Sequence, residues 1–189
     1  MIKRIISQED REKKKRRNQF IVGGVLAVLM IMSTVGFALF SGEEENTTSK
    51  ITYNNLVFYK TLNGWQTTIN GRNFEFQNNP LEVQDIRITN VSLEDYYNKA
   101  LFIDSQDASA TYEIYYNLNG IASRIQNACL EEENCSSELP VKTCNDSVIV
   151  IETLNTTSIE KRENCLIIKA KEGEAIKVVD AFLYKIFGI

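Results

Sequence analysis

A run of 21 residues without a charged side chain, from Phe20 to Phe40, constrains this 189-residue chain more than any other feature. It reads FIVGGVLAVLMIMSTVGFALF. Because a bilayer core takes about 20 apolar residues in helical form, the run predicts one membrane-spanning helix. A cleaved signal peptide, with Gly36 and Ala38 preceding the cleavage site, is the alternative. The apolar region of a signal peptide is usually about 7–15 residues, so the longer run favours an uncleaved signal anchor.

The charges on either side of the run predict its orientation. Residues 1–19 contain 8 Lys and Arg against 3 Asp and Glu, and the whole chain contains 21 and 25, which leaves 13 basic and 22 acidic residues beyond the run. Basic residues beside a span stay cytoplasmic. We therefore expect a cell-membrane protein with a basic cytoplasmic tail (1–19), an anchor (20–40), an acidic polar linker (41–50) and an extracytoplasmic domain (51–189).

The basic cluster at residues 13–17 is interpreted as a topology signal. A site for anionic lipid or for nucleic acid is the other interpretation of such a cluster, since each basic residue near an anionic surface contributes about 1 kcal/mol. A cluster beside a span needs no further role. We therefore expect the tail to lie near anionic lipid and expect no nucleic-acid partner.

Cysteines and glycosylation sequons also fall on the predicted outer side. An even number of cysteines outside the cytoplasm predicts two disulfides. Three pairings are open, and the spacing favours Cys144–Cys165 and Cys129–Cys135, because Cys144 and Cys165 stand at the beginnings of two apolar segments. The Asn-x-Ser/Thr sequons are candidates for glycosylation and lie at Asn46, Asn90, Asn134, Asn145 and Asn155.

The chain has no histidine. This excludes the commonest general base, the commonest metal ligand and the usual serine or cysteine triad. The cysteine spacings contain neither the redox C-x-x-C pattern nor the paired short spacings of a zinc site. The acidic triple Glu131–Glu133 matches no calcium loop and is interpreted as solvated surface. No metal or cofactor is expected.

Two Asn-Gly pairs, Asn63-Gly64 and Asn70-Gly71, separate alternating apolar segments and predict an antiparallel meander with two two-residue turns. Such turns place Leu62 opposite Trp65 and Phe58 opposite Ile69. Opposed residues share a face of the sheet, which is interpreted as core rather than as an aromatic ligand platform. The predicted apolar face is Phe58, Leu62, Trp65, Ile69, Phe74 and Phe76, and the predicted polar face is Tyr59, Gln66, Thr68, Asn73 and Glu75.

The rest of the chain predicts strands and helices in alternation. Alternating residues predict a short strand at 85–88, and apolar runs predict strands at 100–104, 147–152 and 165–169. An apolar stripe predicts a helix over 107–129 and another over 172–187 with its stop at Gly188. The segment 155–164 is expected to be a connection. Three tyrosines flank the first stripe and either pack on the sheet or form a sugar-binding or partner surface: Tyr112, Tyr115 and Tyr116.

These elements predict an α+β fold, or a small α/β fold. A transmembrane helix is followed by an antiparallel β-meander and a small sheet covered by two helices. Whether the strands of the small sheet are parallel or antiparallel stays open, as does the oligomeric state.

The segments PVKTC, SVIVIE, ENCLIIKA and VVDAFLYKIFGI lie between Pro140 and Ile189. They resemble the closing portions of small, uncharacterised, single-pass membrane-anchored proteins of archaeal cell envelopes. The resemblance extends to the order of anchor and meander. It implies an envelope location and no catalytic role, and it carries no functional residues over to this chain.

The leading functional hypothesis is a non-enzymatic cell-envelope protein with an interaction or structural role and an envelope protein as its partner. The alternative is a membrane-tethered hydrolase that acts on envelope glycans with carboxylates. Such an enzyme needs two acidic groups about 5–10 Å apart in a cleft. Asp104, Asp107 and Glu152 lie near predicted strand ends and are the candidates. Thiol–disulfide exchange is disfavoured because no C-x-x-C motif is present.

Overall fold

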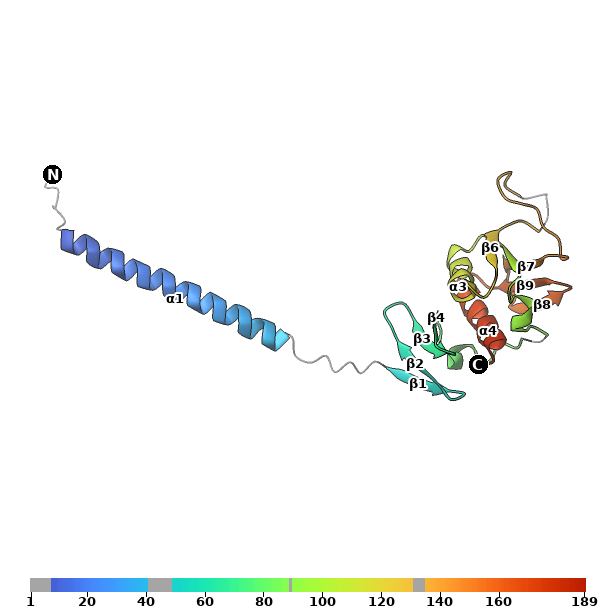
Figure 1. The fold of residues 1–189 in the computed structure, drawn as a ribbon, viewed down its shortest axis with the longest axis horizontal. Helices are drawn as coiled ribbons and strands as arrows, with labels where there is room; N and C mark the ends of the chain where they lie inside the picture. Colours follow the sequence, from blue (N-terminus) through green and yellow to red (C-terminus); the bar gives the residue numbers. More distant parts are fainter. Residues whose placement is uncertain (1–7, 41–48, 89, 131–134) are drawn as a thin grey trace. The chain divides into compact units, whose positions relative to one another are not determined.

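The computed structural model describes residues 8–40, 49–88, 90–130 and 135–189, and within helix α1 (Gln8–Phe40) it describes the side chains of residues 16–32. The chain divides into two units, Met1–Thr47 and Thr48–Ile189 (Figure 1). In the described part of the chain, no helix is both long enough and apolar enough to cross a bilayer. The predicted span continues to Phe40, past the last described side chain of α1. Residues 41–48 of the predicted linker lie outside the described set.

The second unit begins with a four-stranded antiparallel sheet of β1 (Lys50–Tyr53), β2 (Leu56–Lys60), β3 (Trp65–Ile69) and β4 (Arg72–Phe76), in that order. The meander prediction is confirmed, but β1 was not predicted. Asn54 and Asn55 both have positive φ and turn β1 into β2, as Asn-Gly does elsewhere. Lys50, which was expected to end the linker, is the first residue of β1.

The register across the Asn70-Gly71 turn is confirmed, with Trp65 opposite Phe76. The register across Asn63-Gly64 is wrong by two residues, because Lys60, not Leu62, lies opposite Trp65. Thr61 closes the longer loop: its N–H donates to the Gly64 carbonyl at 2.8 Å. A shift of two residues keeps every side chain on its face. Phe58, Trp65, Phe74 and Phe76 are therefore buried as expected, while Ile69 is half-buried and Leu62 is fully exposed.

The strand predicted at 85–88 is wrong. Asn79 instead begins a short helix, α2 (Pro80–Val83), by accepting hydrogen bonds from the N–H groups of Leu81 and Glu82 at 2.9 and 3.2 Å. Proline at the first helical position suits this start because its missing N–H would be unpaired there. A single 3₁₀ turn, η1 (Leu93–Asp95), leads to the second sheet.

The second sheet has five strands in the order β6-β5-β7-β9-β8. Neighbours among β6, β5, β7 and β9 are parallel, and β8 is antiparallel to β9. The predicted strands at 100–104, 147–152 and 165–169 are confirmed; β6 and β8 were not predicted, and β8 occupies the segment expected to be a connection. The bounds are β5 (Ala100–Ser105), β6 (Arg124–Asn127), β7 (Ser147–Thr153), β8 (Ser158–Arg162) and β9 (Cys165–Ala170).

Two helices accompany this sheet. The helix predicted over 107–129 ends early, as α3 (Ala108–Leu118). Asn119 leaves helical geometry and Gly120 has φ +77°, so the apolar residues beyond Leu118 pass into β6 instead of continuing the stripe. The closing helix α4 (Ala175–Phe187) is confirmed, begins three residues later than predicted, and ends at Gly188 in the left-handed conformation.

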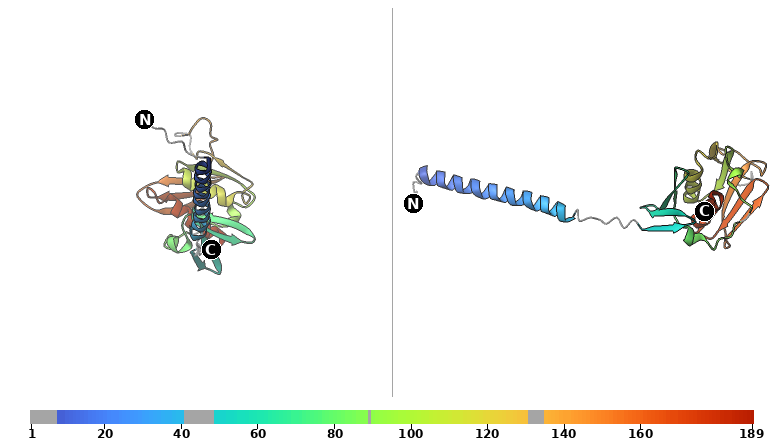
Figure 2. Two further views of the ribbon diagram at one scale, coloured as in Figure 1. Left: turned by 90° about the vertical axis from the view of Figure 1, so that its left-hand side faces the viewer. Right: turned by 60° about the horizontal axis from the view of Figure 1, so that its bottom comes forward.

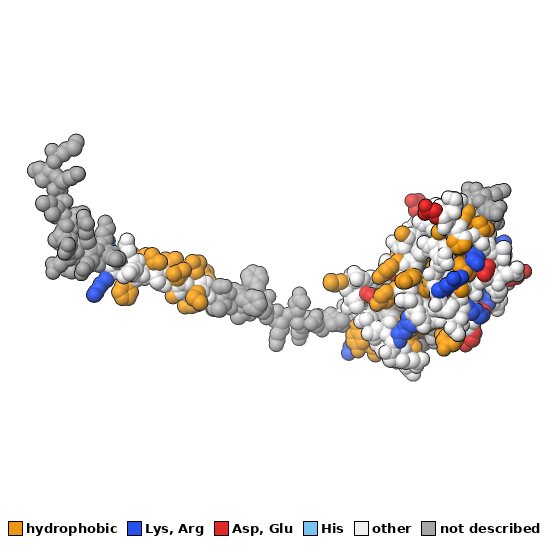
Figure 3. Space-filling view, turned by 45° about the horizontal axis from the view of Figure 1, so that its top comes forward, with side chains coloured by type: hydrophobic (Ala, Val, Ile, Leu, Met, Phe, Trp, Pro, Cys, Tyr) orange, Lys and Arg blue, Asp and Glu red, His pale blue; other side chains and the backbone are white. Residues whose placement is uncertain are grey.

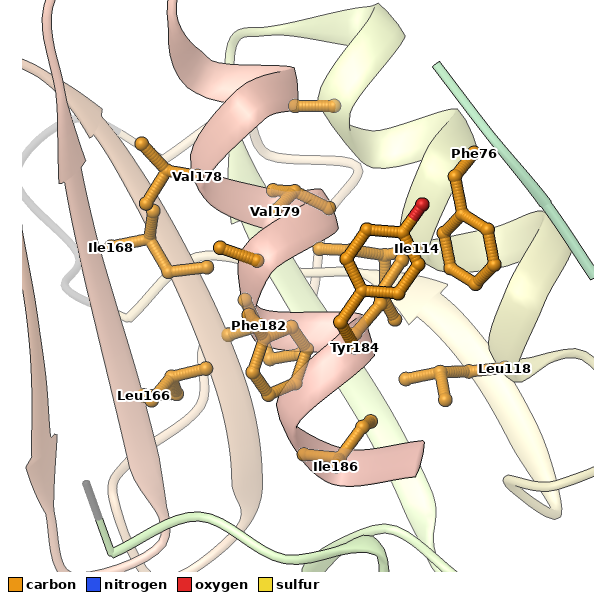
Figure 4. Packing of buried hydrophobic residues seen from close by; sticks show 14 of the residues in the cluster. Phe76, Ile114, Leu118, Leu166, Ile168, Val178, Val179, Phe182, Tyr184 and Ile186 are labelled. Carbon is orange, nitrogen blue, oxygen red and sulfur yellow. The ribbon is translucent and has the colours of Figure 1, made fainter. Parts of the chain in front are cut away.

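Helices α3 and α4 form a middle layer between the two sheets (Figures 1 and 2). The expectation that two helices cover a small sheet is confirmed, but their other side packs on the meander. Figure 4 shows Val178 and Phe182 of α4 beside Ile168 and Leu166, with Tyr184 turned toward Phe76. The rings of Phe76 and Tyr184 lie 4.3 Å apart. Helix α4 is therefore buried from both sides.

The opposite face of the five-stranded sheet is covered by the segment between β6 and β7. Phe102, Val148, Val150 and Ile167 form a separate apolar cluster there with Ala128 and Leu130. The disulfides Cys129–Cys135 and Cys144–Cys165 hold this segment, and both preferred pairings are confirmed. The fold is thus α+β, with an antiparallel sheet, a mixed sheet and a helical layer between them.

Candidate functional site

A cleft of about 690 Å³ lies at the carboxyl ends of β5 and β7, where α3 begins. From β5 the chain crosses to β6 on one side, whereas β7 leads to β9 on the other. In sheets with parallel strands, ligands bind outside the carboxyl ends at such a divergence. Asp104, Asp107 and Glu152 all line the cleft. The structure therefore brings the three predicted acidic residues together.

Two of these carboxylates already have structural partners. Asp104 Oδ2 accepts a hydrogen bond from the Leu130 N–H at 2.8 Å and so anchors the segment that follows β6. Asp107 caps α3, because its Oδ1 accepts from the Ala110 N–H at 2.9 Å. The Ser105 hydroxyl accepts from the Asp107 N–H at 3.0 Å and fixes the turn between strand and helix.

Glu152 is the exposed member of the three. It lies opposite Lys169 in the register of β7 and β9, while the Lys169 ammonium lies 3.5 Å from Glu160. Among the described residues, no three His, Cys, Asp or Glu side chains are arranged to hold a metal ion. Glu131–Glu133 lie outside the described residues. Of the three carboxylates in the cleft, Asp104 and Asp107 therefore hold backbone N–H groups, and Glu152 is the one available to a ligand.

A carboxyl pair that sequence reasoning missed lies between α3 and α4. Glu113 and Asp180 are buried and lie close enough for each to shift the pKa of the other. Asp180 Oδ2 accepts from the backbone and side-chain N–H groups of Asn78 at 2.8 and 2.9 Å. Glu113 Oε1 accepts from the Gln77 N–H at 3.2 Å. In the described chain, no hydrogen-bond donor reaches Asp180 Oδ1.

Burial raises the pKa values of both carboxyls of this pair. Burial raises the pKa of Asp180 to about 9, and the negative charge of Glu113 is the second cause. Burial also raises the pKa of Glu113. The nearby Tyr184 hydroxyl donates to the Asn78 carbonyl at 2.6 Å, and burial raises its pKa above the usual range. At neutral pH, Asp180 therefore holds a proton, and the pair fastens the end of β4 to both helices.

The pattern of α3 contained a signal for this pair. Ala110, Glu113, Ile114 and Asn117 follow at spacings of three and four, which places them on one helix face. Asn117 Nδ2 donates to the Glu75 carbonyl at 2.8 Å from that face. The predicted stripe followed the apolar residues alone and so passed over both polar side chains. An acidic residue within a buried stripe indicates a hydrogen-bonded partner across the layer.

The sequons that can be placed are accessible. Asn90, Asn145 and Asn155 are exposed, whereas Asn46 and Asn134 lie outside the described residues. An exposed sequon meets the steric requirement for a glycan, so the three described ones stay candidates for modification.

Comparison with protein-family models, with curated proteins and with solved structures returns no significant match. The resemblance to archaeal envelope proteins therefore stays a prediction from the sequence. A function is therefore inferred from the residues of this chain alone.

Proposed function

We propose that the protein is a single-pass membrane protein that displays a non-enzymatic interaction domain on the outer side of the membrane, in the cell envelope. The observation that carries this proposal is the uncharged run from Phe20 to Phe40 within α1. Its basic flank favours a cytoplasmic N-terminus. The partner is an envelope component that the outer domain meets.

The described side chains of α1 support a lipid surrounding. Phe20, Ile21 and Val22 are consecutive, point in three directions about 100° apart, and are all more than half exposed. Val25, Leu26 and Leu29 continue the same pattern. Figure 3 shows hydrophobic side chains along the described part of α1, with basic side chains at one end. A helix that is apolar all round is stable only when it is covered on every side, and a bilayer does this.

The second unit supports the outer location. Its two disulfides suit an oxidising compartment, where such bonds persist. The exposed sequons Asn90, Asn145 and Asn155 suit the same side of the membrane. Asp104 and Asp107 already accept hydrogen bonds from backbone N–H groups, and the chain has no histidine. Both facts favour binding over catalysis.

Membrane partition tests the anchor. The double variant Leu26→Arg/Leu29→Arg places two charges in the run, and each costs about 2.5–3.5 kcal/mol at the centre of a span. We expect the natural chain to stay with membranes through alkaline carbonate extraction and the double variant to be released. Tyr97→Arg, at an exposed position of the second unit, is the matched control and should stay with the membranes. Release of the natural chain would refute the anchor.

The cleft between β5 and β7 favours a second candidate function. It places Asp104, Asp107 and Glu152 around one space of about 690 Å³, which is large enough for a sugar. The candidate is a membrane-tethered hydrolase of envelope glycans with Glu152 as acid or base. Isolated envelope glycan incubated with the full chain should then release reducing ends, and Glu152→Gln should abolish the release. Equal release by the Glu152→Gln variant would remove this candidate.

A further inference from the structure

A second cleft, of about 480 Å³, lies on the other side of the start of α3, between this helix and β6. Helix α3 packs inward through Ala110, Ile114 and Leu118 and turns its tyrosines outward. Tyr112 and Tyr115 line the cleft over Ile125. The packing role considered for these tyrosines is therefore wrong, because Tyr112, Tyr115 and Tyr116 are 63%, 46% and 41% exposed.

The lining of this cleft carries no charge. Beside the two tyrosines it contains the amides of Gln106 and Asn127 and the hydroxyl groups of Ser105 and Thr111. Within the described residues, the side chains of Gln106 and Asn127 have no hydrogen-bond partner in the protein, so they are available to a ligand. Gln126 also borders the cleft, but it lies opposite Phe102 in the register of β5 and β6, so its side chain points to the other face of the sheet. An amide both donates and accepts hydrogen bonds, and a sugar hydroxyl does the same.

The neighbouring clefts extend this one at both ends. The cleft at β5 and β7 shares Ser105, Gln106 and Ala108 with it. A third cleft, of about 320 Å³, shares Tyr112 and is lined further by Tyr116, Glu75 and Glu113. No Lys or Arg lines any of the three clefts among the described residues. An anionic ligand would lose its hydration here without gaining an opposite charge.

The tyrosine rings supply the apolar part of the recognition. The rings of Tyr112 and Tyr116 lie 6.0 Å apart and are inclined by 33°, which gives a broad aromatic surface along α3. The faces of pyranose rings carry C–H groups that pack on such surfaces, while the ring hydroxyls point to the side. Aromatic side chains with a polar group suit surfaces that are apolar in one part and wet in another.

From these observations we propose that the groove along α3, formed by Gln106, Tyr112, Tyr115, Tyr116 and Asn127, binds a neutral oligosaccharide. The inference rests on the proposed function in that a domain displayed in the envelope meets glycans there. Binding itself does not depend on the orientation of the chain. The aromatic groups pack on sugar rings, and the amides hydrogen-bond with the hydroxyls.

Calorimetric titration of the full chain, held in micelles of a detergent without a sugar head group, tests the proposal. The neutral probes are maltotriose, mannotriose and triacetylchitotriose, and the anionic comparator is trigalacturonate. We expect at least one neutral probe to bind more tightly than trigalacturonate. Tyr112→Ala should weaken that binding about tenfold, as expected for the loss of an aromatic contact together with its buried area. Tyr97→Ala removes an equally exposed tyrosine outside the groove and should leave the affinity unchanged.

Several results would overturn the proposal. One is the absence of binding by every neutral probe while circular dichroism shows a folded chain. Tighter binding of trigalacturonate is another. Binding that persists in the Tyr112→Ala variant would place the ligand elsewhere, for example along the open edge of β6. Carbonate extraction of the same chain reports the anchor independently, so failure of the groove and failure of the proposed function give different results.

Discussion

The two sheets of the outer unit bury their strands differently. In the four-stranded sheet, burial alternates along a strand: in β3, Trp65 and Thr67 are buried, whereas Gln66 is half-buried and Thr68 is exposed. In the five-stranded sheet, Val148 to Ile151 of β7 are all buried, because helices cover one face and the disulfide-linked segment covers the other. Antiparallel sheets tolerate one wet face, whereas parallel strands are usually buried on both.

This difference determines what each sheet tolerates. In the first sheet, a turn that is longer by two residues does no harm, because a shift of the strand register by two residues keeps the apolar side chains on the same face. A displaced strand in the second sheet would misplace side chains on two packed faces at once. We therefore expect substitutions at the contact of α4 with the second sheet to be the most costly, and those on the wet face of the first sheet to be the least costly.

The largest effect is expected for Phe182→Ala. Phe182 is fully buried on α4 and packs toward Leu166, as Figure 4 shows. Removal of a fully buried aromatic ring costs about 3–5 kcal/mol. Urea denaturation measures this loss in the free energy of unfolding. Lys177→Ala, at an exposed position of the same helix, is the control and should change stability by less than about 0.5 kcal/mol.

The disulfides should stabilise the second sheet unequally. Cys144–Cys165 joins residues 21 apart, and Cys129–Cys135 joins residues 6 apart. Closing these loops contributes about 3 and about 2 kcal/mol in the chain-entropy model. Cys144→Ser should therefore lower the melting temperature more than Cys135→Ser does. The opposite order in scanning calorimetry would contradict the role assigned to the longer loop.

Much of this comparison was predictable from the sequence, and the exceptions have physical causes. Continuous apolar runs gave β5, β7 and β9, and the Asn-Gly pairs gave the meander. Strands β6 and β8 lack such runs because each lies at an edge with few buried residues. The helix predicted over 107–129 was too long because Ile121 and Ile125 continue the apolar spacing of α3 beyond Gly120. The backbone geometry at Asn119 and Gly120 ends the helix there.

The candidate site was predictable only in part. Asp104, Asp107 and Glu152 were found because acidic residues at strand ends are visible in sequence. The pair Glu113 and Asp180 depends on two helices brought together across 67 residues of chain, which no local pattern reveals. The cleft along α3 forms only because β6 lies beside β5. The sequence therefore did not indicate that the amides of the cleft lie near the tyrosines.

A smaller effect on stability is expected from the buried pair Glu113 and Asp180, which lies between the first sheet and the helices. Because the pKa of Asp180 is raised from 3.8 to about 9 in the folded protein, the folded state binds its proton more tightly than the unfolded state. Its stabilising contribution is therefore full below about pH 4 and decreases as the pH rises toward 9. The raised pKa of Glu113 acts in the same direction.

Asp180→Asn should remove the contribution of Asp180 to this dependence on pH. The amide can accept from Asn78 and donate to Glu113 without titrating. We expect the variant to be more stable than the natural chain at pH 8, by about 1–3 kcal/mol, and to gain little at pH 4. Urea denaturation at several pH values checks this. Parallel pH profiles for both chains would show that Asp180 does not hold the proton.

The smallest effects should lie on the wet face of the first sheet. Trp65 is buried while Tyr59 is 48% exposed. Trp65→Ala should cost about 3 kcal/mol or more, whereas Tyr59→Ala and Leu62→Ala should each cost less than about 1 kcal/mol. Thermal unfolding of the three variants measures this contrast. Similar losses for Trp65→Ala and Tyr59→Ala would mean that both faces are packed.

The sidedness of the chain tests the central claim most directly. Protease is added to intact cells that carry the protein with an epitope tag at each end. We expect the C-terminal tag to be lost and the N-terminal tag to be kept, because the basic tail stays inside and the disulfide-bonded unit lies outside. Lysis before the protease is added should expose both tags. Protection of the C-terminal tag in intact cells, with its loss after lysis, would contradict the outer location of the domain.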